Sequence, residues 1–255
     1  MIPAQRQKII LDSLTQNKVL SITELTEFLG VSHMTIRRDI QKLEQEGRVL
    51  SVSGGIQLAE HITSEPSHVT KRSLYFDEKR AIAREAAKLV KPHMTVYLDA
   101  GTTSLVLAEY ISGFSDLVVI SNDLVVIEYL IQHSQCQLYH TGGFVLRKNH
   151  SCVGNHAGDF LLTVNVDIGF LSASSWTMRG ISTPDEMKVS VKKSAALSAA
   201  KRVFICDSSK YGKIATFNAL SLDKLDVIIT DDKLPENVQA TIRQNGIQLI
   251  IAEKE

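Results

Sequence analysis

Residues 30–47 read GVSHMTIRRDIQKLEQEG, a segment that combines a glycine turn, a helix start and two adjacent arginines. Ser32 is a favourable N-cap residue for that helix. Apolar side chains that would form its buried face recur at helical spacing, at Ile36, Ile40 and Leu43. The pattern predicts a helix whose first turns can enter the major groove of DNA.

The side chains that we expect to contact DNA lie in the N-terminal half of this helix or on the same exposed face. They are Ser32, His33, Thr35, Arg37, Arg38 and Lys42. They imply double-stranded promoter DNA as a partner, with base contacts from the first turns and phosphate contacts from the cations. The simpler alternative is an ordinary amphipathic helix with solvated arginines. We expect the carboxylates Asp39, Glu44 and Glu46 to face away from DNA or to neutralise the arginines.

The flanking sequence favours the DNA-binding interpretation. Two helices are expected before this segment, within residues 4–16 and over 24–29, the second capped by Thr23. A hairpin is expected after it, over residues 48–58, with Gly54 and Gly55 near its turn. Three helices and a hairpin predict a winged helix-turn-helix domain over residues 1–58.

The rest of the chain has a different pattern. Residues 59–75 are polar, contain Pro66 and show no period, so we expect a linker. In residues 76–255, apolar runs at 95–99, 117–120, 136–140, 167–171, 202–207, 227–230 and 247–251 alternate with helical stretches at 78–90, 103–112, 123–132, 186–200 and 235–245. Strands that are apolar throughout and separated by helices predict an α/β domain with a mostly parallel sheet covered on both faces.

Polar and small residues follow five of these predicted strands, in the segments 99–104, 121–123, 141–143, 172–175 and 207–210. The carboxyl ends of parallel strands share one edge of a sheet, where ligands bind in α/β folds. The first segment, Asp-Ala-Gly-Thr-Thr-Ser, also opens a helix whose backbone N–H groups suit an anion. We favour one pocket for a small phosphorylated polyhydroxy molecule, against the alternative of five unrelated polar turns.

The predicted effector site draws on these segments and on the helix expected over 186–200. Its residues are Asp99, Gly101, Thr102, Thr103, Asn122, Gly142, Gly143, Ser172, Ser174, Lys188, Lys192, Asp207 and Lys210. Lys188 and Lys192 lie four residues apart, a helical spacing at which like charges repel. A bound anion would relieve this repulsion, and a solvated face is the equally weighted alternative.

The composition is that of a globular protein, with 28 basic residues against 28 acidic ones in 255. Any DNA contact must therefore be local. The widely spaced cysteines, Cys136, Cys152 and Cys206, predict buried free thiols in a cytoplasmic protein. We expect no metal, no cofactor and no membrane contact, since there is no apolar signal core and no run near the ~20 residues of a membrane span.

Seven motifs occur along the chain in a fixed order: Val31–Ile40, Gly54-Gly55, Asp99–Thr103, Asn122, Gly142-Gly143, Asp207–Gly212 and Ile229–Asp231. In this order they resemble those of DeoR-type bacterial transcription regulators, over essentially the whole chain. The resemblance implies a winged helix, a sensor domain related to ribose-5-phosphate isomerase and a phosphorylated sugar-type effector. It also implies a homo-oligomer, a dimer or tetramer, and control of nearby catabolic genes, usually by repression. The chain looks closest to regulators associated with four-carbon sugar-acid breakdown.

Two departures from that family pattern bear on function. The family hairpin often reads Arg-x-His-Gly-Gly-Ala, whereas Ser51, Ser53 and Ile56 occupy the Arg, His and Ala places, so weaker wing contacts with DNA are expected. Lys188 stands where the family often carries a glutamate. A cation there would suit an effector with an added carboxylate, such as a phosphorylated sugar acid.

Two other classes of function compete. A sugar-phosphate isomerase fused to a DNA module would need a carboxylate base beside the substrate carbon. The related isomerase carries an acidic cluster after its equivalent of the 167–171 strand, whereas residues 169–176 hold no carboxylate here. Asp99 and Asp207 remain, and we expect them to orient loops, so binding without turnover is predicted. The third class is a winged helix used only for protein contacts, which salt-dependent binding to a promoter fragment would exclude.

Overall fold

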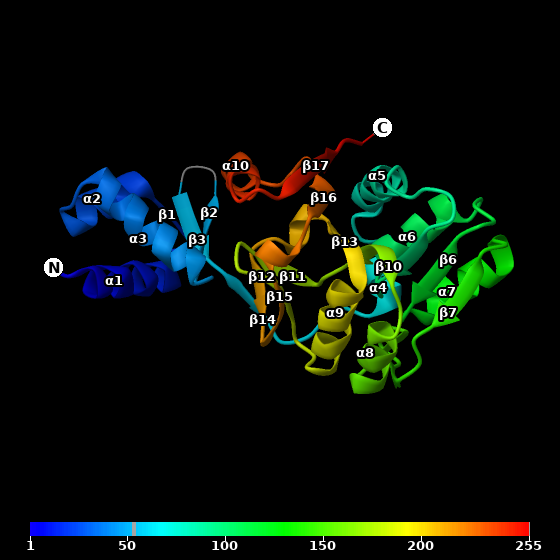
Figure 1. Ribbon diagram of the computed structural model, residues 1–255. Coiled ribbons are helices and arrows are strands. Elements are labelled where there is room, and N and C mark those ends of the chain that lie inside the picture. The colour runs from blue at the N-terminus through cyan, green and yellow to red at the C-terminus, as the bar shows by residue number, and fades with distance from the viewer. Residues whose placement is uncertain (53–54, 255) are drawn as a thin grey trace.

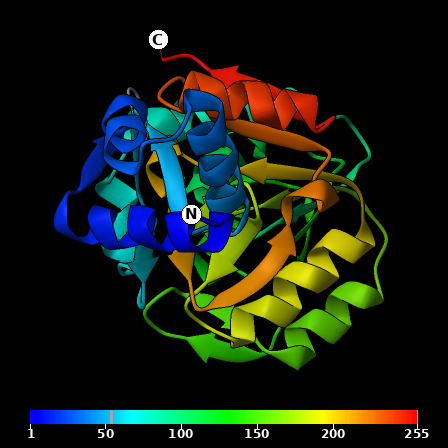
Figure 2. The same ribbon diagram turned by 90° about the vertical axis from the view of Figure 1, so that its left-hand side faces the viewer.

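The computed structural model describes residues 1–52 and 55–254. The chain forms a small N-terminal head and a larger body, which lie side by side in Figure 1. Figure 2 looks from the head toward the body, with the N-terminal helix in front.

The head contains three helices and a three-stranded antiparallel sheet. The helices are α1 (Pro3–Gln16), α2 (Ile22–Leu29) and α3 (His33–Gln45), and the strands are β1 (Val19–Ser21), β2 (Val49–Val52) and β3 (Gly55–Leu58). The sheet order is β1-β3-β2. Its core joins all three helices to the hairpin through Ile10, Leu25, Ile36, Leu43 and Ile56. The predicted winged helix-turn-helix is confirmed.

The caps of the head helices correct one detail of the prediction. Ser21, not Thr23, caps α2: its hydroxyl accepts from the Glu24 N–H at 3.1 Å, while the Glu24 carboxylate accepts from the Ser21 N–H at 2.7 Å. This reciprocal pair starts the helix one residue before Thr23. Ser32 caps α3 as predicted, accepting from the Thr35 N–H at 3.3 Å.

The hairpin explains one of its two glycines. Gly55 lies in β3, where an added Cβ would stand 2.2 Å from the Leu20 carbonyl oxygen of β1. Only glycine permits this close approach of the two strands. Gly54 and Ser53 lie outside the described residues.

A seven-stranded parallel sheet forms the centre of the body. Its strands are β5 (Thr95–Leu98), β6 (Val118–Ser121), β7 (Gln137–His140), β10 (Val166–Leu171), β13 (Ala199–Ile205), β16 (Val227–Asp231) and β17 (Gln248–Ala252). Their spatial order is β17-β16-β13-β10-β5-β6-β7, and every neighbouring pair is parallel. Each predicted apolar run forms one of these strands, which confirms the predicted α/β domain.

Helices cover both faces of the sheet. The helices α5 (Phe76–Ala87), α6 (Thr102–Ile111) and α7 (Leu124–His133) pack on one face. The helices α8 (Asn155–Leu162), α9 (Met187–Ser198) and α10 (Glu236–Gln244) pack on the other. Along β5, Val96 and Leu98 face the first core and Tyr97 faces the second, all fully buried. This two-sided burial is why the strands are apolar throughout.

Short antiparallel strands complete the body. They are the hairpin β8 (Phe144–Leu146) and β9 (Ser151–Val153), and a sheet of β11 (Ser175–Thr177), β12 (Gly180–Thr183) and β15 (Phe217–Ser221). The cysteines are free and buried as predicted. None of the helices in residues 1–52 and 55–254 combines the length and apolar character that a membrane crossing requires.

Residues 59–75 connect the head to the body and are themselves folded. They contain β4 (Glu60–Ile62) and α4 (His68–Ser73), and β4 pairs in parallel with β14 (Lys213–Ala215) of the body. The N–H of Glu60 donates to the Gly212 carbonyl at 3.1 Å. A second contact joins the lobes directly, because the Arg179 guanidinium donates to the Glu46 carbonyl at 3.0 Å.

Candidate functional site

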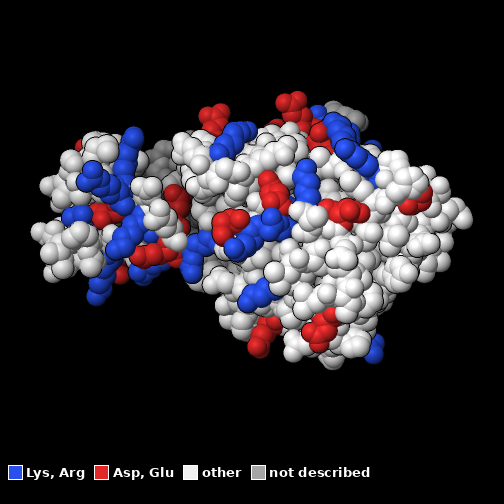
Figure 3. Space-filling view, viewed as in Figure 1, with Lys and Arg blue, Asp and Glu red and all other residues white. Residues whose placement is uncertain are grey.

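The face of α3 that points away from the head carries the predicted DNA contacts. Ser32, His33, Arg37, Arg38 and Lys42 are exposed, and Thr35 is half-buried beside its capping partner Ser32. None of the three cations forms an ion pair with another described residue. Figure 3 shows Lys and Arg side chains distributed over the head, among fewer acidic ones. These cations are therefore free to neutralise phosphates.

The carboxylates of α3 are used inside the head. Asp39 is buried, with an ion pair to Arg6 of α1 and a hydrogen bond from the Gln7 amide at 3.1 Å. Glu44 accepts from the Ser51 N–H at 3.0 Å and from the Ser51 hydroxyl at 3.1 Å. Asp39 thus faces away from the DNA side, as expected, and neutralises Arg6 rather than the helix arginines. Glu44 anchors the wing at the position where the family pattern has arginine.

A cavity opens at the carboxyl edge of the parallel sheet. It encloses about 790 Å³ of space, including the solvent at its mouth. The strands β5, β6, β10 and β13 bring Asp99, Asn122, Ser172 and Asp207 to its wall, and α9 adds two lysines. Eleven of the predicted effector residues line it: Asp99, Gly101, Thr102, Thr103, Asn122, Ser172, Ser174, Lys188, Lys192, Asp207 and Lys210.

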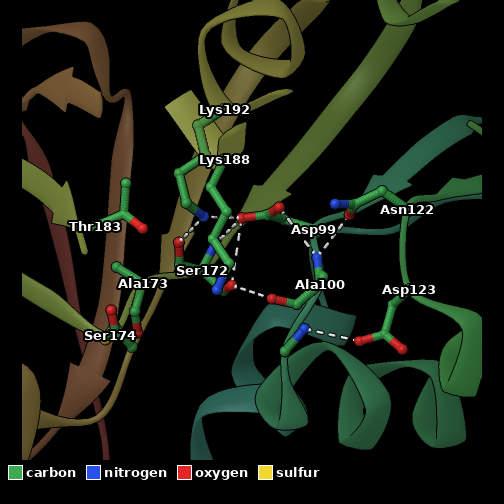
Figure 4. A network of polar contacts seen from close by, with 12 residues as sticks. Asp99, Ala100, Asn122, Asp123, Ser172, Ala173, Ser174, Thr183, Lys188 and Lys192 are labelled. Atoms are coloured by element: carbon green, nitrogen blue, oxygen red, sulfur yellow. Dashed lines mark hydrogen bonds and ion pairs between the residues drawn. The ribbon is translucent and has the colours of Figure 1, made fainter. Parts of the chain in front are cut away.

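Asp99 is at the centre of the polar network (Figure 4). One carboxylate oxygen accepts from the Lys192 ammonium at 2.6 Å and from the Ser172 N–H at 3.0 Å. The other accepts from the Ala100 N–H at 3.0 Å. Lys192 also donates to the Ser172 carbonyl at 2.6 Å. These contacts fix the loops after β5 and β10 against α9.

The loop that leads into α6 is held from β6. The side-chain amide oxygen of Asn122 accepts from the Ala100 N–H at 2.8 Å, and the Asp123 carboxylate accepts from the Gly101 N–H at 3.0 Å. Burial raises the pKa of Asp123 to about 6, although its backbone hydrogen bonds oppose the rise. The loop therefore presents the N-terminal turn of α6, with Thr102 and Thr103, to the cavity.

Two predicted effector residues are not brought into this lining. Gly142 and Gly143 follow β7 with φ of 65° and 111°, a backbone region that favours glycine. A Cβ at Gly143 would lie 2.8 Å from the Val153 carbonyl oxygen of β9. The positive φ explains Gly142, and the positive φ together with close packing against β9 explains Gly143, without a ligand.

The connecting segment supplies an acidic side chain to the cavity. Glu65 lies there almost fully buried. One carboxylate oxygen accepts from Lys188 at 2.7 Å and from the Ser174 hydroxyl at 3.1 Å. The other accepts from Lys71 at 3.1 Å and from the Asn149 amide at 2.9 Å. Burial raises the pKa of Glu65, but Lys188 and Lys71 outweigh it and hold the pKa well below its usual range.

The cavity has a surplus of positive charge. Five lysines line it (Lys71, Lys79, Lys188, Lys192 and Lys210) against three carboxylates (Glu65, Asp99 and Asp207). Burial lowers the pKa of Lys79 to about 8, and its ammonium donates to the Leu74 carbonyl at 2.5 Å. The chain as a whole has no net charge, so this surplus of two is a local property of the site.

Two buried polar atoms of the lining have no hydrogen-bond partner among the described residues, His68 Nε2 and Ser151 Oγ. Buried polar groups are normally hydrogen-bonded. Burial and the nearby charges of His150 and Lys71 lower the pKa of His68 to about 4, so its ring is neutral at physiological pH. A neutral imidazole and a hydroxyl can each bond a polyhydroxy ligand.

Two family models match the chain. Residues 75–232 match the DeoR C-terminal sensor domain, and residues 6–61 match the DeoR-like helix-turn-helix domain. The chain belongs to the DeoR family of transcriptional regulators.

Several relatives match nearly the whole chain. An HTH-type transcriptional regulator of Haemophilus influenzae is 50% identical over 98% of both chains. The HTH-type regulator YgbI of Escherichia coli is 48% identical over 100% of both chains. The glycerol-3-phosphate regulon repressor of Escherichia coli is 28% identical over 98% of this chain and 99% of its own.

Among solved structures, a ribose-5-phosphate isomerase in complex with phospho-erythronic acid is 16% identical, with a TM-score of 0.39 over 52% of each chain. The isomerase of Neisseria gonorrhoeae is 17% identical, with a TM-score of 0.38 over 53% of each chain. Likenesses this weak carry no weight for the ligand of this DeoR-family chain.

Sequence reasoning missed seven polar residues of the cavity: Glu65, His68, Lys71, Lys79, Asn149, Ser151 and Thr183. Lys79 lies in the helix predicted over 78–90, and the others come from segments without a clear period. Helix α4 has only six residues, too few for a recognisable apolar face. The available signal was the pair Lys188 and Lys192, whose spacing was equally compatible with a bound anion and with a solvated face. The anions in the structure are two carboxylates of the chain itself, Glu65 and Asp99.

The carboxylates of the cavity are all engaged with lysines. Asp99 pairs with Lys192, Glu65 with Lys188 and Lys71, and Asp207 lies 3.6 Å from Lys210. Asp207 also accepts from the Ser209 hydroxyl. Within the described residues, no three His, Cys, Asp or Glu side chains gather so that they could hold a metal ion. The arrangement suits binding of a polar anion more than removal of a proton from carbon.

Proposed function

We propose that this DeoR-family regulator represses genes for carbohydrate or sugar-acid catabolism and that a phosphorylated sugar or sugar acid controls it. The effector binds in the cavity at the carboxyl ends of β5, β6, β10 and β13. Its binding changes the affinity of the winged-helix head for promoter DNA. The protein acts in the cytoplasm as a homo-oligomer that pairs its heads on repeated half-sites.

The observation that carries the effector class is the surplus of lysines over carboxylates in a cavity rich in hydroxyl groups. The backbone N–H groups at the start of α6 suit a phosphate. Thr102, Thr103 and Ser172 suit the hydroxyls of a sugar. A relative named for a glycerol-3-phosphate regulon fits a phosphorylated ligand, and its name as a repressor fits the proposed sign.

The competing function is a sugar-phosphate isomerase. A base for isomerisation needs lone pairs directed at the substrate carbon. The carboxylates Glu65, Asp99 and Asp207 are instead held by lysine ammonium groups. We propose binding without turnover. If the purified protein converts ribose 5-phosphate and the Asp207→Asn variant does not, the protein is an isomerase and this proposal is wrong.

The test is a titration of DNA binding with candidate effectors. Genomic DNA fragments are incubated with the protein, and a fragment that it binds is isolated. The complex of the protein with this promoter fragment is then followed by mobility shift. Phosphorylated sugar acids and phosphorylated sugars are added in parallel with their unphosphorylated forms. We expect only the phosphorylated compounds to change DNA affinity, by roughly 5- to 150-fold. No change with any of them would exclude this effector class.

A further inference from the structure

The subsite around Glu65 is built to hold a carboxylate. Four donors from different parts of the chain converge on it: Lys71 of α4, Asn149 before β9, Ser174 after β10 and Lys188 of α9. The two lysines and Glu65 are each at least four-fifths buried at their side chains. Of the five residues in this subsite, Glu65 is the one that lies between β4 and α4, in the segment that connects the head to the body.

We propose that Glu65 is a displaceable internal ligand, whose place is taken by the carboxylate of a phosphorylated sugar acid. The proposal rests on the proposed function, because it assigns a chemical class to the effector of the same cavity. The phosphate lies toward the start of α6, and the carboxylate lies between Lys188 and Lys71. Phosphorylated sugars that lack a carboxylate bind without displacing Glu65.

The charge of the cavity fits this exchange. With Glu65 in place, five lysines face three carboxylates. When Glu65 leaves, the surplus rises from two to three. A phosphorylated sugar acid carries up to two negative charges on its phosphate and one on its carboxylate at neutral pH. Lys71 and Lys188 are largely shielded from solvent at their side chains, so leaving them together without an anion is costly, and the ligand group that replaces Glu65 must carry a negative charge.

The connectivity shows how displacement reaches the head. Glu65 follows the last residue of β4 by three positions, and Lys210 precedes the first residue of β14 by three. These two paired strands therefore both lead into the cavity. On its other side β4 is joined to the wing strand β3 through Ala59, whose N–H donates to the Arg48 carbonyl at 3.1 Å. Release of Glu65 thus loosens the strand pair that orients the head.

The orphaned Nε2 of His68 is a second, independent observation. His68 lies three residues from Glu65 at the start of α4 and is among the residues that line the cavity, and its Nε2 is buried without a hydrogen-bond partner among the described residues. A hydroxyl of the ligand provides the partner that this nitrogen lacks among the described residues. The same ligand then contacts the Glu65 subsite through its carboxylate and His68 of α4 through a hydroxyl.

The experiment compares Glu65→Gln with wild type and with Glu60→Gln. Glu60 is the matched control, because it lies in β4, is 64% exposed at its side chain and is 3.7 Å from Lys213, outside the cavity. The probes are erythronic acid 4-phosphate and erythritol 4-phosphate, which differ only in the carboxylate. Affinity is measured by calorimetry, and exchange of backbone amides in residues 59–65 by mass spectrometry.

We expect Glu65→Gln to bind the acid about tenfold more tightly than wild type, since the competing carboxylate is gone. The polyol phosphate should change by less than about twofold, and Glu60→Gln should match wild type with both probes. Without any ligand, the backbone amides of residues 59–65 should exchange their hydrogens faster in Glu65→Gln than in wild type. Addition of the acid to wild type should cause the same acceleration. Glu65→Ala should bind the acid as tightly as Glu65→Gln does. Agreement between the two variants shows that the effect comes from loss of the negative charge and not from the introduced amide.

Equal affinity of the acid for wild type and Glu65→Gln would overturn the displacement while leaving the proposed function intact. Failure of both probes to bind any variant, with all variants folded by circular dichroism, would reject the effector class and the displacement together.

Discussion

The recognition helix and the cavity use charge in opposite ways. On α3 the cations Arg37, Arg38 and Lys42 are exposed, while the carboxylate Asp39 is turned into the core of the head. In the cavity, Lys192 is buried and Lys188 is mostly buried, and each is paired with a carboxylate of the chain. An exposed cation can bind a phosphate by releasing only counterions. A lysine that already holds a carboxylate of the chain can accept a second carboxylate in the same place only if the first one leaves, so the cavity can act as a switch and the helix cannot.

The largest effect is expected from the carboxylate that is hidden in the head. Asp39→Ala leaves Arg6 buried without its partner and should lower the free energy of unfolding of the head by about 3 kcal/mol. Trp176, the single tryptophan, lies in the core of the body, so its fluorescence follows the body, whereas circular dichroism follows both lobes. The control Asp12→Ala, on the exposed side of α1, should change stability by less than about 0.5 kcal/mol. If the two variants lower the free energy of unfolding equally, the Asp39–Arg6 pair does not stabilise the head.

The next effect concerns the exposed cations. Arg37→Ala should weaken promoter binding by about 1–3 kcal/mol and reduce the salt dependence of binding by about one phosphate contact. Effector binding should be unchanged, since Arg37 lies in the other lobe. Lys91→Ala, an exposed cation of the body, serves as the control in the same fluorescence anisotropy titration. If Arg37→Ala and Lys91→Ala behave alike, α3 is not the helix that reads DNA.

The smallest effect is a pH dependence on the cavity side. Burial holds the pKa of His68 at about 4, below its ordinary value of 6.5, and the charged groups facing it are His150, Lys71, Arg72 and Lys79. The unfolded chain takes up this proton first as the pH falls, so stability present above pH 6.5 is lost progressively toward pH 4. Between pH 7 and 5, wild type should lose about 1–2 kcal/mol more than His68→Gln. Denaturant unfolding at each pH measures this, and the exposed His61→Gln should titrate like wild type.

The sequence predicted the parts of the molecule in which local pattern and tertiary structure agree. The seven strands were recognisable because burial on both faces makes them apolar throughout, and polar residues such as Asp99 and Ser172 marked their ends. Parallel pairing then brings these ends to one edge without further information. The fold and most of the cavity followed from this.

The connection between the lobes could not be predicted in the same way. Glu65 meets Lys188 across 123 positions of the chain, and nothing in its neighbours marks it as buried. The strand β4 has three residues and pairs with another three-residue strand far along the sequence, so it has no period of its own. Gly142 and Gly143 were predicted as pocket residues from their place after a strand, and they are not among the residues that line the cavity. A left-handed backbone, close packing and ligand binding all select glycine, so the sequence alone does not separate them.

Coupling between the cavity and the head requires that the effector and the promoter DNA change each other's affinity. The affinity of erythronic acid 4-phosphate is measured by calorimetry with the free protein and with the protein saturated by its selected promoter fragment. We expect DNA to change this affinity by the same factor by which the acid changes DNA affinity, at least about fivefold. An acid that binds equally well with and without DNA would contradict the coupling, however tightly it binds.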